Sequence, residues 1–191
     1  SQHSYANDKA IRNQSLNPSL ETDLQAATEH IYGPGSKAVT YSGGQPQIGT
    51  SSRRTGSTRH DSGNASDTYF YNADGDRLQG DSLAPIAQHW LANNMGGVGL
   101  EMAGGGVHLD NHTGRAPTWA YGSQTPAQKR AIQAGLRGEQ SPFAAATVPT
   151  PQPRYESSTN AAPLGQVDRQ ELGPSPIDFS TDLYAPKTYE P

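Results

Sequence analysis

Two histidines and an aspartate have the types and the spacing of a metal site. His60 and Asp67 lie seven positions apart in a segment rich in Gly, Ser and Asn, and His108 follows 41 residues after Asp67. On one helix, side chains seven positions apart would lie about 10 Å from each other, too far to hold one ion. We therefore expect His60 on a loop and Asp67 on the strand that follows, where the two side chains can converge.

The segment between these residues favours that arrangement. Gly63 and Asn64 tolerate the positive φ of a tight loop, and residues 65–71 have the β-branched and aromatic character of a strand. If His108 lies on a neighbouring strand, it completes a His, Asp, His set. Three protein ligands leave one position for water, which is typical of a catalytic rather than a structural zinc site.

The first segment resembles the signature of the zinc D-alanyl-D-alanine peptidase and hedgehog-type superfamily. That signature is His-x-x-Gly-x-Ala-x-Asp, and the matching residues are His60, Gly63, Ala65 and Asp67. In the superfamily this segment supplies two zinc ligands, and a later histidine supplies the third. The resemblance therefore implies that His60, Asp67 and His108 are the ligands of a Zn²⁺ ion.

The later part of the match is most similar to the murein endopeptidase branch of that superfamily. The branch has a Gly-Gly-Val-Gly segment followed by Val-His-x-Asp-x-Gly. Here residues 96–99 read Gly-Gly-Val-Gly, and residues 107–110 read Val-His-Leu-Asp. The glycine that follows, Gly114, comes later than the branch pattern expects. The resemblance covers roughly residues 38–122.

The resemblance also implies an activity. Relatives cut the short peptides of bacterial peptidoglycan, so we expect a zinc metallopeptidase that acts as an endopeptidase or carboxypeptidase. In many members an acidic residue three positions before the last zinc histidine is the base, but here that position is Gly105. Asp110 is the first alternative, either as the base or as a group that fixes the His108 imidazole. Glu101, on the adjacent predicted strand, is the second.

Three arginines precede His60 in its loop, at positions 53, 54 and 59. A guanidinium near the metal would suit a substrate carboxylate through paired hydrogen bonds. The resemblance implies such an arginine ahead of the zinc histidine, and we take Arg54 and Arg59 as the candidate substrate-binding residues. The alternative for each arginine is a solvated loop charge.

The composition limits the classes of protein and of site. Only 32% of the 191 residues are hydrophobic, which predicts that part of the chain lies outside any core. There is no cysteine, so nitrogen and oxygen ligands must hold any metal. Residues 1–138 contain eleven Lys and Arg and eleven Asp and Glu, and this balance gives no electrostatic footprint for nucleic acid. No apolar run is long enough to span a bilayer.

Hydrophobic periodicity predicts the elements that position the site. Helices are expected over residues 18–32, 83–93 and 125–136, and strands over residues 38–41, 65–71, 96–102, 107–110 and 119–121. The expected fold class is α+β, with a small, mostly antiparallel sheet that carries Asp67 and His108. The first two helices would cover this sheet, as in hedgehog and D,D-peptidase domains.

We divide the chain into an N-terminal arm over residues 1–16, a zinc peptidase-like domain over 17–137 and a Pro-rich extended tail over 138–191. Nine of the fifteen prolines fall in residues 139–191, with large apolar residues spaced between them. Such a segment cannot fold alone. It is either a disordered linker or an arm that becomes ordered along other proteins of an assembly.

The N-terminus lacks the apolar core of a signal peptide. Together with the arm and the tail, this suggests a protein carried by a larger particle, such as the tail or baseplate of a bacteriophage virion. It would then act at the bacterial periplasm and cell wall. Two alternatives remain open: a structural or adaptor virion protein that reuses the peptidase fold without chemistry, and a wall-binding module that holds zinc and peptide without cutting.

Overall fold

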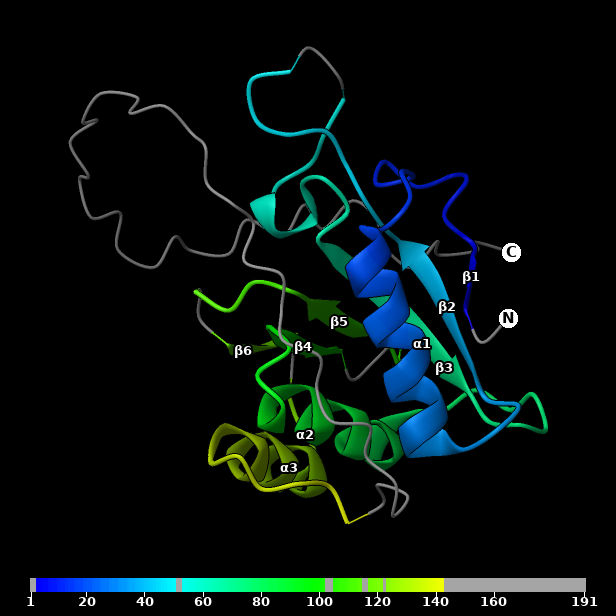
Figure 1. Cartoon of the computed structure of the whole chain (residues 1–191), viewed down its shortest axis with the longest axis vertical. Helices are drawn as coiled ribbons and strands as arrows, with labels where there is room; N and C mark the ends of the chain where they lie inside the picture. Colours follow the sequence, from blue (N-terminus) through cyan, green and yellow to red (C-terminus); the bar gives the residue numbers. More distant parts are fainter. Residues whose placement is uncertain (1–2, 51–52, 102–104, 115–116, 122, 143–191) are drawn as a thin grey trace, which may run out of the picture. The chain divides into compact units, whose positions relative to one another are not determined.

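The computed structural model describes residues 3–50, 53–101, 105–114, 117–121 and 123–142 (Figure 1). Its helices are α1 (Pro18–Tyr32), α2 (Ala84–Ala92) and α3 (Pro126–Leu136), with short 3-10 turns η1 (Thr58–His60) and η2 (Gly80–Leu83). Its strands are β1 (His3–Tyr5), β2 (Lys37–Ser42), β3 (Ala65–Tyr71), β4 (Val98–Glu101), β5 (Val107–Asp110) and β6 (Thr118–Tyr121).

The described strands form one mixed sheet in the order β1-β2-β3-β5-β4-β6. The α+β class is confirmed, and the three central pairings are antiparallel as predicted. The two outer pairings, β1 with β2 and β4 with β6, are parallel. Both outer strands reach their neighbours through crossovers rather than hairpins, and a crossover is what joins parallel strands.

The three predicted helices form where their sequence signals lie. Helix α1 begins at Asn17, whose side chain accepts a hydrogen bond from the Ser19 amide at 3.0 Å, with Pro18 in the first turn. Helix α3 begins with a capping box between Thr125 and Gln128. These caps satisfy amides that a helix end leaves unpaired. None of the described helices is long and apolar enough to cross a membrane.

Helices α1 and α2 cover one face of the sheet, and Figure 1 shows α1 lying across β2 and β3. The apolar stripe of α1 and the Trp90 ring of α2 meet inward-facing strand residues such as Phe70 and Leu109. Because side chains alternate across a strand, burying Phe70 on this face directs Asp67 to the opposite face. The two layers therefore fix which face carries the polar site.

The structure corrects the expectation of an N-terminal arm over residues 1–16. His3–Tyr5 is a strand of the sheet, the His3 Nε2 atom lies 2.7 Å from Thr40 Oγ1, and Leu16 is buried in the core. A three-residue strand is too short to show a period in the sequence. The expected tail, from residue 138 on, lies outside the described residues from residue 143.

Candidate metal centre

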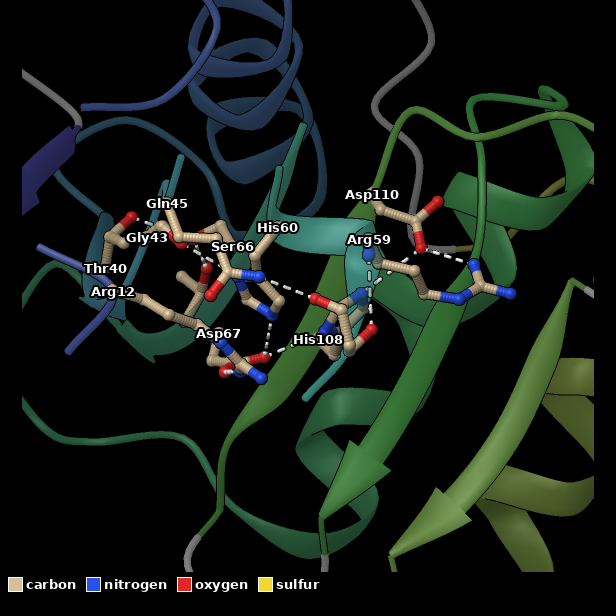
Figure 2. Close-up of polar contacts among 12 residues, drawn as sticks. Arg12, Thr40, Gly43, Gln45, Arg59, His60, Ser66, Asp67, His108 and Asp110 are labelled. Atoms are coloured by element: carbon tan, nitrogen blue, oxygen red, sulfur yellow. Dashed lines mark hydrogen bonds and ion pairs between the residues drawn. The ribbon is translucent and has the colours of Figure 1, made fainter. Parts of the chain in front are cut away.

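Three side chains from three elements converge on the face of the sheet opposite the helices. His60 ends η1, Asp67 lies on β3 and His108 on β5, and Asp67 and His108 are direct cross-strand partners. Each offers one ligand atom, and these atoms all lie within 4.8 Å of one another. Asp67 Oδ1 is 3.5 Å from His60 Nε2 and 2.8 Å from His108 Nδ1 (Figure 2). The predicted set is thus brought together.

The loop between His60 and β3 depends on Gly63. Its φ is 75°, and a Cβ atom added there would lie 2.5 Å from the Ser15 carbonyl oxygen. Gly63 also connects the loop to α1, because its carbonyl accepts a hydrogen bond from the Asn17 amide at 2.8 Å. Only glycine meets both demands, a left-handed backbone and close contact with another segment. The spacing between His60 and Gly63 therefore has a structural reason.

Hydrogen bonds orient both imidazoles toward Asp67. His60 Nδ1 donates to the Gly43 carbonyl at 2.8 Å, which leaves Nε2 facing the aspartate. His108 Nε2 lies 3.2 Å from Asp110 Oδ2, which leaves Nδ1 facing the aspartate. Metal-binding histidines are typically held in this way, with the second ring nitrogen on a carbonyl or a carboxylate.

The distances suit a zinc ion. Ligand atoms about 2.1 Å from a tetrahedral ion lie about 3.4 Å from one another. The 3.5 and 2.8 Å distances to Asp67 Oδ1 lie on either side of that value. Two imidazole nitrogens and a carboxylate oxygen are also ligands that zinc accepts. The residues present therefore fit the metal that the sequence predicts.

The electrostatics of the cluster favour a negative charge on Asp67 and a positive charge on the His108 ring. Burial raises the pKa of Asp67, but attraction to His60 and hydrogen bonds from both histidines outweigh it, so that pKa lies well below its usual range. Burial lowers the pKa of His60. Burial would lower the pKa of His108 too, yet its hydrogen bonds to Asp110 and Asp67 raise it. The protonated form of the His108 ring, which lies between the partly exposed Asp67 carboxylate and the buried Asp110 carboxylate, is thus stabilised.

Both oxygens of the Asp110 carboxylate accept hydrogen bonds, on the side of the His108 ring away from Asp67. Its Oδ1 accepts hydrogen bonds from the amides of Gly97 and His112 at 2.8 and 2.9 Å. Its Oδ2 accepts one from Arg59 Nη1 at 2.5 Å and faces His108 Nε2. A carboxylate that is completely buried and bonded to four donors has no free lone pair for a substrate proton. Of the two predicted roles, its placement favours fixing the His108 ring.

The two predicted substrate arginines lie against internal carboxylates. Arg59 pairs with Asp110 and lies over the Trp119 ring, 4.3 Å from its centroid. Arg54 pairs with Asp61 and donates from Nε to the Pro46 carbonyl at 3.2 Å. Both arginines therefore hold the loop that carries His60.

The sequence analysis missed Arg12, which reaches the cluster from the N-terminal segment. Arg12 Nη1 lies 3.4 Å from Asp67 Oδ2, the oxygen that does not face the histidines (Figure 2). Its Nε is shielded from solvent and has no hydrogen-bond partner among the described residues. No local pattern could have revealed it, because it lies 55 positions from Asp67.

The sequence also predicts Glu101 as a candidate base. Glu101 ends β4, paired with Tyr121, and its side chain lies outside the described part of the chain. Gly105, the position at which the resemblance would imply an acidic residue, has a φ of 65°.

In comparisons with known proteins, no family model, no curated protein and no solved structure matches this chain. The site is therefore assigned from its own geometry.

Proposed function

We propose that this protein is a zinc-dependent peptidase that cleaves the cross-link or stem peptides of peptidoglycan. The observation that carries the proposal is the convergence of His60, Asp67 and His108, with both imidazoles already oriented by the Gly43 carbonyl and Asp110. The substrate class comes from the resemblance of the first segment to the zinc D-alanyl-D-alanine peptidase signature. The set of ligands supports the reaction class independently.

Each described residue has a distinct part in this proposal. When bound, a zinc ion would polarise a peptide carbonyl and lower the pKa of water. His60, Asp67 and His108 would hold the ion, and Asp110 would keep the His108 ring in place. Arg12 pairs with Asp67, its side chain is partly exposed, and its guanidinium can donate to an oxygen of the substrate. That hydrogen bond would position the peptide beside Asp67.

A second candidate function is a virion adaptor or structural protein that keeps the fold without the chemistry. One observation favours it: both described carboxylates of the site, Asp67 and Asp110, are occupied by donors, and Gly105 stands at the usual base position. In either case we propose carriage by a bacteriophage tail or baseplate. The spaced apolar residues of the Pro-rich segment 139–191 support an assembly partner.

The test measures metal content and cleavage together. We expect the purified protein to bind about one zinc ion per chain and to release peptides from purified peptidoglycan, with release abolished by a chelator and identified by mass spectrometry. His108→Ala should lose both properties, and Arg12→Gln should keep zinc but cleave more slowly. The matched control His89→Ala should keep both. Zinc binding without cleavage would favour the wall-binding module, and the absence of zinc binding would overturn the metal site and favour the adaptor.

A further inference from the structure

A single row of paired residues crosses four strands of the sheet and contains two of the candidate metal ligands. Asp67 of β3 pairs with His108 of β5. His108 pairs in turn with Gly99 of β4, and Gly99 pairs with Trp119 of β6. Residues that are directly opposite on neighbouring strands project from the same face of the sheet. Because Gly99 has no side chain, the row has a gap between His108 and Trp119.

The Trp119 and His108 side chains meet across this gap. Neighbouring strands lie about 4.8 Å apart, so the backbones of β5 and β6 are separated by roughly twice that distance. The centroids of the His108 and Trp119 rings are nevertheless only 4.7 Å apart, with their planes at 65°. A side chain at position 99 would stand between the two rings. The glycine at this position therefore permits their contact.

Arg59 connects Trp119 to the carboxylate on the other side of the His108 ring. Its guanidinium carbon lies 4.3 Å from the Trp119 ring centroid, and its Nη1 pairs with Asp110 (Figure 2). A guanidinium over an indole ring is a favourable contact. Gly97 leaves room for the pair, because a Cβ atom added there would lie 2.6 Å from Arg59 Nη1 and 2.8 Å from Asp110 Oδ2. Trp119, Arg59 and Asp110 thus form a continuous support around His108.

The neighbours of the His108 ring restrict different motions. Asp67 and Asp110 lie at its two nitrogens, at 2.8 and 3.2 Å, and decide which nitrogen faces the metal centre. The rings of His60 and Trp119 pack against its sides, with centroids 4.9 and 4.7 Å away. Packing of this kind limits rotation about the Cα–Cβ bond, which the hydrogen bonds alone do not prevent. His60 is itself a candidate ligand, so Trp119 is the neighbour without a part in metal binding so far.

We propose that Trp119 is a positioning residue of the metal centre: packed across Gly99, it holds the His108 ring at the angle at which Nδ1 faces Asp67. This inference rests on the proposed function for the identity of the ion. Without the indole, the His108 side chain would populate further rotamers, and zinc would bind only the fraction that is correctly oriented. Groups that orient a metal ligand typically change metal affinity by about 10–100-fold.

The first test measures the zinc affinity of the full-length protein by competition with a chromophoric chelator. Trp119→Ala should bind zinc about tenfold more weakly. Trp119→Phe should keep most of the affinity, because an aromatic ring still packs against the imidazole. Thermal melting of each zinc-free variant would show whether it is folded.

A second variant fills the gap and leaves the tryptophan in place. Gly99→Val introduces a residue that favours strands but separates the two rings, so it should weaken zinc binding about as much as Trp119→Ala. Gly114→Val is the matched control, since a Cβ atom added at Gly114 has no neighbour within 4 Å. It should bind zinc like the wild type.

The double variant tests whether the two positions act through one contact. Trp119→Ala combined with Gly99→Val should bind zinc like Trp119→Ala alone, because the valine then has no ring to displace. Losses that simply add would show that the positions act separately, and this would contradict the inference.

NMR of the zinc-free protein gives a readout that does not depend on the metal. The wild type should show one sharp set of His108 ring signals, with nuclear Overhauser contacts to the Trp119 indole. In Trp119→Ala and in Gly99→Val the ring signals should broaden or divide, because the side chain exchanges between rotamers.

The outcomes separate this inference from the proposed function. Unchanged zinc affinity and unchanged His108 signals in folded Trp119→Ala would overturn the role of Trp119 and leave the zinc site standing. A wild type that binds no zinc would overturn the metal centre. The NMR comparison would then decide the inference alone: loss of the single ring orientation in Trp119→Ala would support it, and an unchanged spectrum would overturn it.

Discussion

Two pairs of histidines in this protein have the same distance between their rings but different neighbouring groups. The rings of His60 and His108 have centroids 4.9 Å apart, and so do the rings of His30 and His89, which lie between α1 and α2. The first pair shares the carboxylate of Asp67. The second pair belongs to no group of three potential ligands in the described chain.

The surroundings, rather than the distance, set the charge of each pair. His108 has carboxylates at both nitrogens, and these raise its pKa despite burial. His89 has the Asn93 amide 3.2 Å from Nδ1, and burial together with His30 lowers its pKa to about 4. His108 in the first pair therefore favours its protonated form, whereas His89 in the second pair favours its neutral form. A sequence search for neighbouring histidines would not distinguish them.

The strongest test of this comparison is metal binding. Asp67→Asn and His108→Ala should each weaken zinc binding by at least about 100-fold, since each removes one of three protein ligands. His30→Ala and His89→Ala should leave the affinity unchanged. Competition titration with a chromophoric chelator gives the zinc dissociation constant of each of the four variants. Equal affinities in the four variants would show that neither pair binds zinc.

A smaller effect is expected when Asp110 loses its charge. Asp110→Asn leaves the largely buried Arg59 guanidinium without its anion and loosens the His108 ring. We expect the free energy of unfolding to fall by about 3 kcal/mol and the zinc affinity by about 10–100-fold.

The control for Asp110 is Asp61→Asn, which breaks the more exposed pair with Arg54. This substitution should lower the free energy of unfolding by about 1 kcal/mol and leave the zinc affinity unchanged. Urea denaturation with a chelator present measures the stabilities, and titration of the folded variants measures zinc. A loss of zinc affinity in Asp61→Asn equal to that in Asp110→Asn would contradict the orienting role of Asp110.

The second pair predicts a pH effect on stability. Above pH 6.5 His89 is neutral in both states, and as the pH falls from 6.5 to 4 the unfolded chain binds a proton that the folded protein does not. The folded state should therefore lose about 1–2 kcal/mol over that window, after allowance for the partial exposure of the ring. His89→Gln should reduce this loss. Identical pH profiles of the two metal-free proteins would rule out the effect.

The smallest expected effect comes from making the second pair resemble the first. Asn93→Asp places a carboxylate beside His89 Nδ1, where the amide now lies. The pKa of His89 should rise by about one unit, measured from its imidazole resonances by NMR. Zinc should bind only weakly at the pair of His30 and His89 in this variant, because a single new carboxylate does not orient the His30 ring. An unchanged pKa would mean that burial alone controls this pair.

Much of the metal cluster could be predicted from the sequence because its determinants are local. The spacing of His60, Gly63 and Asp67 encodes a tight loop that runs into a strand, and the alternation along β3 places Asp67 opposite the buried Phe70. Helices α1 and α3 likewise begin at capping residues in their own segments. Short-range backbone preferences and burial periods are sufficient for such features.

Tertiary structure alone decided the partners of Arg12 and Arg59 and the place of β1 at the edge of the sheet. Arg12 reaches Asp67 across 55 positions, and Arg59 reaches Asp110 across 51. The strand His3–Tyr5 is recognisable only by its parallel pairing with β2. These contacts depend on how crossovers bring distant segments together. The position of an arginine in the sequence does not indicate which carboxylate it will contact. Local patterns therefore identified the candidate ligands, whereas packing determined which groups orient and surround them.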